Sequence, residues 1–493
     1  MSRTQSDKNS LLQRIRSGLP MSRRQQLRLT VLLSIPAILA QLSNIVMEYI
    51  DAAMVGSLGA EASAAIGLTV TSTWLMWGII SSVSTGFAVQ VAHLTGGGDN
   101  EGARSVLRQS LTAVLCFSAV LSAAGLAVSD ALPVWLGGEE SIRHDATLYF
   151  RIFVLSMPVL SLLSLSGSML RCSGNILVPG IINVAMCVAD VVFNFFLIFP
   201  SRTVSVAGRE IAVWGAGLGV EGAAIGTALA GVAGTAVMVY YMWYRSSELR
   251  LARTHGSFKV GGECLKKALK IGLPVGAEHI FICGAQIMTT VIVAPLGAVA
   301  LAAHSLSITA ESLCYMPGYG IADAATTLSG QSIGAGRRDL ARHFGSITVW
   351  TGVAAMTVMG VVMYFAAPAM MGFLSPVEAI RDAGVGVLRI EAFAEPMFAA
   401  SIVAYGVFVG AGDTLVPCMM NLGSMWAVRL VAAALLAPVL GLRGVWIAMC
   451  GELCFRGVIF LARLYGGRWI KIMPNIAIKR EENKLVCYPE REQ

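Results

Sequence analysis

The sequence is poor in charge. Only 13% of its 493 residues are Asp, Glu, Lys or Arg, about half of the roughly 25% that soluble domains carry. In contrast, 56% are hydrophobic, and the mean hydropathy is +0.70. A chain this long and apolar cannot bury its apolar surface in one water-facing globule, so lipid must be its solvent. The composition excludes a soluble protein and predicts an all-α integral membrane protein.

The sequence also lacks the motifs of the common catalytic and metal sites. It contains no HExxH and no DDxxD run, and its ten cysteines form no CxxC pair. The glycine run at 96–98 lacks the lysine of a phosphate-binding loop. We therefore expect no enzyme activity, no cofactor and no disulfide, and we interpret the cysteines as free thiols that act as small apolar residues.

The basic residues are unevenly distributed. The first 28 residues contain several arginines but no long apolar core, so they do not form a signal peptide. Most of the 36 Lys and Arg residues lie in the two tails and in alternate loops, at 94–108, 171–174, 245–270 and 334–342. This asymmetry follows the positive-inside rule and predicts that both termini are cytoplasmic. The net charge of +7 therefore reflects membrane topology, and no nucleic-acid partner is expected.

Apolar runs long enough to span a bilayer occur twelve times. They lie near 28–55, 60–93, 104–129, 145–170, 176–200, 218–244, 268–296, 299–333, 343–373, 382–410, 415–440 and 443–465. Candidate kinks within them are Pro36, Pro158, Pro274, Pro317 and Pro396. The expected organisation is a basic cytoplasmic tail (1–27), an N-lobe of six helices (28–244), a cytoplasmic linker (245–267), a C-lobe of six helices (268–465) and a cytoplasmic tail (466–493).

The second half of the sequence repeats the first. A shift of 238 residues needs no gap from about residue 34 to 183, and it places Pro36 on Pro274 and Arg151 on Arg389. The run 54–68 falls on 292–306 in the same register. Two six-helix bundles with this relation should be pseudo-symmetric about an axis along the membrane normal, with a cavity between them, as in alternating-access transporters.

The buried ionisable residues are not repeated, and they gather on helix faces. Asn44, Glu48 and Asp51 share one face of the first span, and Asp190 and Asn194 share one face of the fifth. An intramembrane acid is functional by default, although a pair that only hydrogen-bonds neighbouring helices remains an alternative. Two carboxylates brought together suit a proton site, and with an amide oxygen added they also suit Na⁺.

The second half has its own polar residues. Acids and tyrosines around a cavity would attract organic cations through charge and cation–π contacts, and this set comprises Glu278, Gln286, Glu311, Tyr315 and Tyr405. In the alternative interpretation, Arg389 and Arg429 pair with Glu391 and Glu395 as structural bridges, and His304 is a core histidine.

Several runs resemble the multidrug and toxic compound extrusion (MATE) family. They are IDAAMVGSLGAEASAAIG (50–67), APLGAVALAAHSL (294–306), LSGQSIGAGRRDLA (328–341), GNILVPGIIN (174–183) and GVEGAAIGTALA (219–230). The resemblance covers roughly residues 28–465 and implies a V-shaped exporter that exchanges organic cations for H⁺ or Na⁺.

The resemblance also implies particular ion-site residues. Prokaryotic members use an Asp in span 1, an Asn followed by an Asp in span 5, and a Thr in span 6. Asp51 and Thr227 match the first and last of these, but Asp190 and Asn194 stand in exchanged order. A Glu that many relatives carry in span 7 is replaced by Ile282.

The sequence thus predicts an antiporter in the cytoplasmic (inner) membrane, expected to act as a monomer. Asp51, Asp190, Asn194 and Thr227 would couple the ion with Asn44 and Glu48 nearby, and Asp51, Asp190 and Asn194 would hold Na⁺ if sodium drives transport. A rival is a lipid-linked oligosaccharide flippase, which should show a cationic cavity for pyrophosphate. A membrane-embedded lipid transferase would need acidic or histidine motifs that the sequence lacks.

Overall fold

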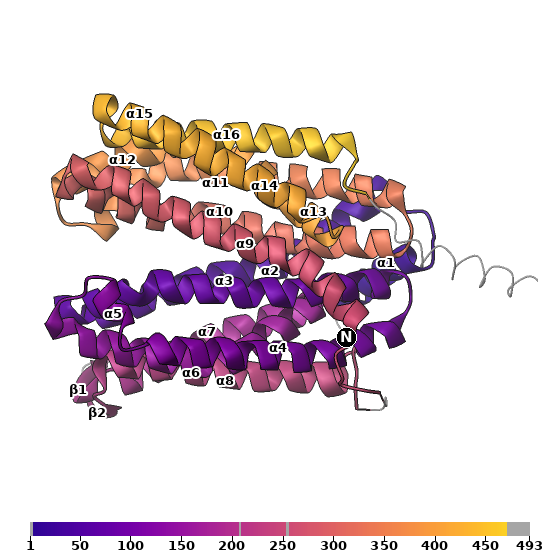
Figure 1. Cartoon of the computed structure of the whole chain (residues 1–493), viewed down its shortest axis with the longest axis horizontal. Coiled ribbons are helices and arrows are strands. Elements are labelled where there is room, and N and C mark those ends of the chain that lie inside the picture. Colours follow the sequence, from indigo (N-terminus) through magenta and orange to yellow (C-terminus); the bar gives the residue numbers. More distant parts are fainter. Residues whose placement is uncertain (1–2, 207–208, 253–255, 471–493) are drawn as a thin grey trace, which may run out of the picture.

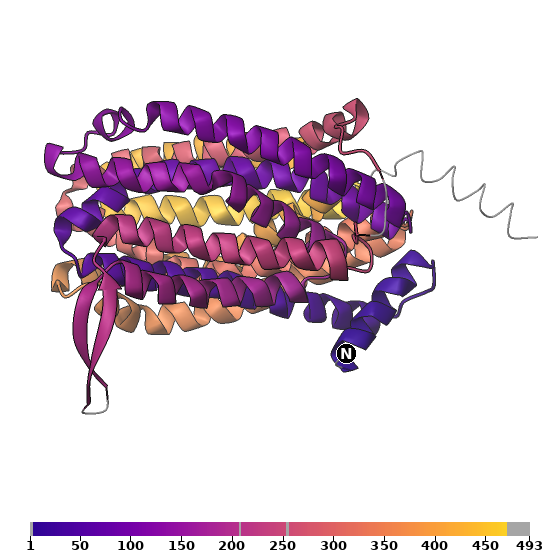
Figure 2. The same cartoon turned by 90° about the horizontal axis from the view of Figure 1, so that it is seen from below.

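The fold consists of two bundles of long helices that lie side by side (Figure 1). The computed structural model describes residues 3–206, 209–252 and 256–470. We call the end of the molecule that carries α1 the terminal end, and the end that carries the strands β1 and β2 the hairpin end (Figure 2). Most of the predicted tail 466–493 lies outside the described residues.

The first bundle is the predicted N-lobe. It contains α2 (Arg23–Gly56), α3 (Ala60–Gly96), α4 (Asn100–Val128), the short α5 (Leu132–Trp135), α6 (Glu140–Cys172), α7 (Leu177–Leu197) and α8 (Gly219–Tyr240) with a π-helical turn, η1 (Tyr241–Arg245). Between α7 and α8, strands β1 (Pro200–Val206) and β2 (Arg209–Ala216) form an antiparallel hairpin. Among the described residues, the second half has no strand at the corresponding position.

The second bundle is the predicted C-lobe. It contains α9 (Gly262–Val293), η2 (Ala294–Leu296), α10 (Ala298–Gly334), α11 (Arg338–Leu374), α12 (Glu378–Glu391), α13 (Glu395–Gly410), α14 (Leu415–Gly423), η3 (Ser424–Arg429), α15 (Leu430–Leu440) and α16 (Leu442–Gly466). A 61° bend separates α12 from α13 and makes one broken span of the pair. Pro396 lies in the first turn of α13, so the kink predicted there is a break.

Each predicted span coincides with a helical segment. By length and apolarity, ten helices of the described residues can cross a membrane, or eleven if the bent pair α12–α13 is one span. The remaining segment, α10, is rich in Gly, Ser and Thr and carries acids, and most of its second half is buried. It packs against helices of both lobes, so protein rather than lipid surrounds its polar groups.

Two predicted boundaries differ from the structure. The basic tail 1–27 contains a helix, α1 (Arg3–Arg16), and α2 already begins at Arg23 behind a capping box made by Ser22 and Gln25. Leu11, Leu12 and Ile15 of α1 are buried in a cluster that draws on both lobes. The linker is also shorter than predicted, because α9 begins at Gly262. In both places the apolar-run criterion missed basic helical turns that project beyond the apolar segment.

The lobes meet along four helices that the repeat relates in pairs. α2 packs against α10, and α3 packs against α9 and α10. At the terminal end the backbones nearly touch. A Cβ on Gly96 would lie 2.2 Å from the Gln331 carbonyl oxygen, and one on Gly334 would lie 2.0 Å from that of His93. Because Gly96 and Gly334 are repeat counterparts, as are His93 and Gln331, this crossing is pseudo-symmetric.

Hydrogen bonds across the lobes reinforce the crossing. His93 Nε2 donates to the Gly410 carbonyl at 2.8 Å, and Gln331 Nε2 donates to the Cys172 carbonyl at 3.0 Å. Cys172 and Gly410 end α6 and α13, and they too are 238 residues apart. Each lobe therefore provides one side-chain donor for a carbonyl at a helix end of the other lobe. Such a carbonyl has no hydrogen-bond partner within its own helix.

Candidate functional site

A buried acidic site lies between α2 and α7 of the N-lobe. The Asn194 amide donates to Asp51 Oδ1 at 2.8 Å and to Asp190 Oδ2 at 3.1 Å. Asp190 and Asn194 are fully buried, and Asp51 is partly exposed. One amide thus bridges two carboxyl groups from different helices, and the structure brings together the acids that the sequence singled out.

The sequence explains why these groups meet. Asp190 and Asn194 are four residues apart, so they stand one above the other on the same face of α7. Gly226 of α8 faces Asn194 and leaves room for it, because a Cβ at this position would lie only 2.0 Å from Asn194 Oδ1. Any larger residue at 226 would push Asn194 away from the two carboxyl groups.

The other predicted coupling residues surround this pair at different distances. Thr227 of α8 lies within side-chain interaction range of Asp190. Glu48 is in electrostatic range of Asp51 but, among the described residues, makes no hydrogen bond to Asp51, Asp190 or Asn194. Asn44 lies seven residues, or roughly 10 Å, along α2 from Asp51. It accepts hydrogen bonds from Asn183 at 2.8 Å and Cys187 at 3.5 Å, so it ties α2 to α7 away from the acids.

Two oxygens of the site have no hydrogen-bond partner among the described residues. They are Asp190 Oδ1 and Asn194 Oδ1, and both are buried. Within the described part of the chain, no group of three or more His, Cys, Asp or Glu residues is placed to hold a metal ion. The site offers two carboxylates and one amide instead, and such oxygen ligands suit a proton or a hard monovalent cation better than a transition metal.

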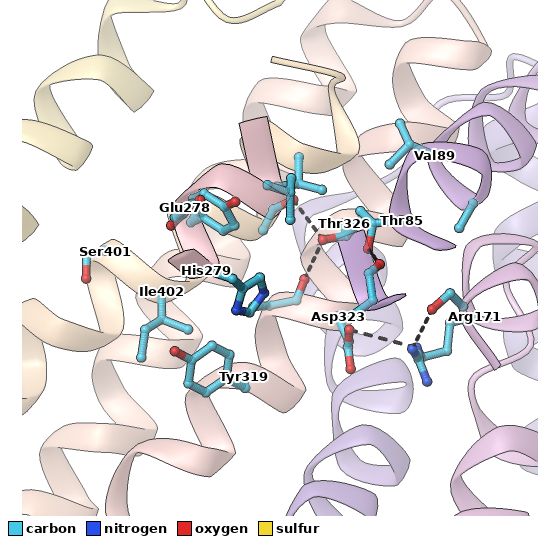
Figure 3. Close-up of a pocket in the computed structure, with 18 of the residues that line it drawn as sticks. Thr85, Val89, Arg171, Glu278, His279, Tyr319, Asp323, Thr326, Ser401 and Ile402 are labelled. Carbon is cyan, nitrogen blue, oxygen red and sulfur yellow. Dashed lines mark hydrogen bonds and ion pairs between the residues drawn. The ribbon is translucent and has the colours of Figure 1, made fainter. Parts of the chain in front are cut away.

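A second feature is a cavity of about 310 Å³ between the lobes. Its lining comes from α2, α3 and α6 of the N-lobe and from α9, α10, α13, α14 and α16 of the C-lobe. Figure 3 shows Glu278, His279 and Tyr319 on one side and Asp323 beside Arg171 on another. The volume lies at the lower end of the range for sites that bind drug-sized molecules.

The residues predicted to line a substrate cavity divide into two groups. Glu278 and Tyr405 do line the cavity, and Glu278 accepts a hydrogen bond from the Asn421 amide. Gln286 follows Glu278 by eight residues, which turns it roughly 80° around α9, and it lies on an exposed face. Glu311 is buried elsewhere, and Tyr315 packs against Tyr319 and Phe398 behind the cavity wall.

The pairing that the alternative interpretation gave for the C-lobe arginines is wrong. Arg429 binds Glu452 through two nitrogens, at 2.9 and 2.7 Å, and Arg456 lies 3.0 Å from the same carboxylate. Arg389 instead lies over the Tyr364 ring at 5.3 Å. The spacing of residues along one helix could not show that α16 supplies the partner, because α16 packs beside η3 only in the folded bundle.

Glu391 and Glu395 therefore form no ion pair with an arginine among the described residues, although Arg429 lies in electrostatic range of Glu391. Both are buried at the bend between α12 and α13, and their four oxygens have no hydrogen-bond partner among the described residues. Glu311 lies in electrostatic range of both. His304 is a core histidine that accepts a hydrogen bond from Trp446 at 3.1 Å, in agreement with the alternative drawn from the sequence.

Sequence reasoning missed three contributors. Glu452 had a signal, because Arg456 follows it by four residues and so shares its helix face. Tyr149 of α6 lies in electrostatic range of Asp51, Asp190 and Glu48, and nothing in its local sequence indicates this. The ion pair between Arg171 and Asp323 joins the two lobes, and no local pattern predicts a contact between residues so far apart in the chain.

Comparison with known sequences identifies relatives over most of the chain. The family model described as MatE matches residues 36–196 and again 274–435, so the two matches begin at the prolines that the repeat superposes. The chain is 26% identical over 445 residues to a probable multidrug resistance protein NorM of Thermotoga maritima, covering 89% of this chain and 92% of that protein. It is 27% identical over 446 residues to a probable multidrug resistance protein NorM of Deinococcus radiodurans, covering 89% and 95%.

Solved structures agree on the fold. A crystal structure of MATE in complex with MaL6 superposes with a TM-score of 0.82 at 19% identity, covering 93% of this chain and 99% of that one. The outward-facing conformation of a multidrug resistance MATE family transporter of the MOP superfamily gives the same TM-score and identity, covering 93% and 98%. Together with the doubled family match and the two six-helix lobes, these similarities confirm the resemblance seen in the sequence: the chain belongs to the MATE family of multidrug efflux transporters.

Proposed function

We propose that the protein is an antiporter that exports organic, mainly cationic, compounds in exchange for H⁺ or Na⁺. The observation that carries this proposal is the Asp51–Asn194–Asp190 group, in which two carboxyl groups share one amide inside the N-lobe. No arginine or lysine forms an ion pair with either acid among the described residues. A group of this kind gains or loses a cation as a unit, which is what an ion-coupling site must do.

The first step is ion uptake. When both carboxyl groups are ionised, they repel one another at short range inside the N-lobe, and one shared amide cannot neutralise them. A proton on either acid, or Na⁺ held by the carboxylates and the Asn194 oxygen, relieves that repulsion. In either case Thr227, which lies within side-chain interaction range of Asp190, would assist in binding the ion.

The second step passes the ion signal to the lobe interface through α2. Asp51 lies near the hairpin end of α2. The other half of α2 contacts the C-lobe closely, since a Cβ on Gly320 of α10 would lie 2.6 Å from the Ile38 nitrogen. Tyr49 also donates to the Thr309 carbonyl of α10 at 2.7 Å. Pro36, next to this contact, removes one helical hydrogen bond and supplies a hinge. An ion that binds one arrangement of α2 more tightly than the other will shift the equilibrium between the two arrangements of the lobes.

The cavity supplies the substrate site. It is lined by two carboxylates, Glu278 and Asp323, and by the aromatic residues Tyr319, Phe398 and Tyr405. Its two arginines, Arg171 and Arg456, already face carboxylates. A lipid-linked oligosaccharide needs unpaired cationic groups for its pyrophosphate, so this balance favours an organic cation over that rival.

The proposal also includes location and assembly. The helix ends that flank the loops after α3, α6 and α10 are basic, with Arg104, Arg171 and Arg338 among their residues, and these loops lie at the terminal end with α1. This distribution favours a cytoplasmic terminal end in the cytoplasmic membrane. The cavity and the acidic site are both complete within one chain, which favours a monomer.

The test uses purified protein in lipid vesicles under an imposed proton or sodium gradient, with a fluorescent cation as substrate. Asp51→Asn should reduce gradient-driven transport by roughly 5- to 150-fold, the span of ordinary coupling free energies. Glu61→Gln is the matched control, since it removes one acid from an exposed position near the same end of the bundle. Its transport should equal that of the wild type.

Two outcomes would contradict the proposal. Wild-type rates in Asp51→Asn under the same gradient would remove the ion site from the N-lobe and direct attention to Glu311, Glu391 and Glu395. Wild-type vesicles that move a lipid-linked oligosaccharide, but no cation under either gradient, would establish the flippase.

A further inference from the structure

An ion pair crosses the lobe boundary inside the cavity. Arg171, in the last turn of α6, belongs to the N-lobe, and Asp323, on α10, belongs to the C-lobe. Arg171 Nε lies 3.8 Å from Asp323 Oδ1, and the two side chains face one another in Figure 3. Both line the cavity, and their side chains are 31% and 33% exposed.

Other contacts hold the lobes together at this level. Thr327 of α10 donates to the Arg171 carbonyl at 3.1 Å, and Gln331 donates to the Cys172 carbonyl at 3.0 Å. The distance between the Arg171 and Asp323 side chains is too long for a hydrogen bond, and exposed pairs of this kind stabilise a fold only slightly. The ion pair is thus not needed to join α6 to α10, and it can open without separating them.

The Asp323 carboxylate is open to a ligand. Among the described residues no hydrogen bond reaches its side chain, which is a third exposed. The other carboxylate of the lining, Glu278, is only 6% exposed and is held by the Asn421 amide. Of the two acids, Asp323 is therefore the one that an incoming cation can reach.

The repeat shows that this charge is specific to one wall. Shifted by 238 residues, Asp323 corresponds to Thr85 and Arg171 corresponds to Val409. All four side chains line the same cavity. Duplication of one unit would give two like pairs, yet the counterpart pair Thr85 and Val409 is uncharged. Val409 packs with Tyr405 in one apolar cluster, and Glu278, beside Tyr405, is buried and held by the Asn421 amide. The repeat-related positions therefore differ, with an accessible ion pair at one and an apolar, aromatic surface at the other.

We propose that Asp323 anchors the positively charged group of the exported compound and that Arg171 is its internal competitor. In the empty cavity Arg171 faces Asp323. An amphipathic organic cation displaces the guanidinium, binds the carboxylate with its charged group and lays its apolar body against Tyr405, Val409 and Phe398. This inference rests on the proposed export of organic cations, and it names the substrate class and the residue that selects it.

The test compares variants that affect the two partners in opposite ways. Asp323→Asn should raise the KM for a monovalent fluorescent cation roughly tenfold, which corresponds to about 1.4 kcal/mol, with a smaller change in the maximal rate. Arg171→Gln should lower that KM roughly threefold, because the carboxylate loses its competitor. The double variant should behave like Asp323→Asn, and neither single change should alter the KM of an uncharged substrate of similar shape.

A purely structural ion pair would give a different result. Both single variants would then shift the KM in the same direction, or not at all, and either outcome overturns the assignment. Asp130→Asn is the control, since it breaks another ion pair, Arg151–Asp130, whose residues do not line the cavity. The KM for the cation should stay within roughly twofold of the wild type.

The binding arm separates this inference from the proposed function. Equilibrium binding of the same dye to purified protein, with no gradient present, needs Asp323 but not ion coupling. Wild-type protein that binds the dye through Asp323 yet transports nothing would refute antiport and retain the anchor. If Asp323→Asn bound the dye with unchanged affinity and transported it at the wild-type rate, the anchor would be refuted and antiport retained.

Discussion

Replacing Glu452 with Gln should destabilise the C-lobe severely. Glu452 is fully buried on α16 and receives Arg429, Arg456 and the Ser424 hydroxyl. Gln has the same shape, but it is neutral, and its amide group would point donors at an arginine. Two arginines, themselves 6% and 9% exposed, would remain without their shared anion.

The magnitude follows from the burial. Breaking a buried ion pair by removing one partner costs about 3–5 kcal/mol. For a unit of the C-lobe's size, 1 kcal/mol corresponds to about 2–4 °C in Tm, so we expect a decrease on the order of 6–20 °C. The control is Asp130→Asn, which breaks the Arg151–Asp130 pair at 2.6 Å. Asp130 is 76% exposed, so this loss should be at most about 1 kcal/mol.

The assay is thermal unfolding in detergent with a thiol-reactive fluorophore. Cys314 and Cys418 of the C-lobe are free and buried, so they become reactive when this lobe opens. If Glu452→Gln lowered Tm no more than Asp130→Asn, the cluster would not be the buried ionic anchor described above. The arginines would then have found other anions, and Glu311 and Glu391 are in range of Arg429.

Two further predictions concern the terminal end. Gly334→Ala places a methyl group against the His93 carbonyl, and overpacking of this kind should cost about 1–3 kcal/mol. The same change at Gly372, where no atom lies within 4 Å, should be neutral or slightly stabilising, and equal Tm values for the two variants would contradict the close approach. Burial lowers the pKa of Lys8 below its usual 10.5, so the folded state disfavours the charged amine. Lys8→Met should therefore raise Tm at neutral pH, with a gain that shrinks as the pH rises toward 10.5, and a gain independent of pH would argue against this cause.

The sequence predicted what depends on periodicity and register. Apolar runs located the spans, and the 238-residue shift predicted two lobes that the doubled family match confirms. Residues three, four and seven apart share a helix face, so Asp51, Asp190 and Asn194 could be grouped before any contact was visible. The repeat also accounts for two equivalent contacts. Asn183 donates to the Ala40 carbonyl, and its counterpart Asn421 donates to Glu278, the counterpart of Ala40.

The sequence could not predict contacts that depend on how helices rotate against one another. One interpretation paired Arg429 with acids of the preceding span, yet its partner, Glu452, lies on α16. Arg171 and Asp323 stand on different lobes, and only the packing of α6 against α10 brings them together. The helix α1 escaped detection because its apolar face, with Leu11, Leu12 and Ile15, is too short to register as a span.

The two hydrogen bonds at the terminal end have a consequence for how the lobes can separate. His93 and Gln331 are counterparts, and so are the carbonyls of Gly410 and Cys172 that accept from them. A rotation about the pseudo-twofold axis stretches both bonds by the same amount, so neither can break alone while the other holds. Opening of this end is thus a concerted event with a single barrier, and a protein with one bond removed should open more often rather than open halfway.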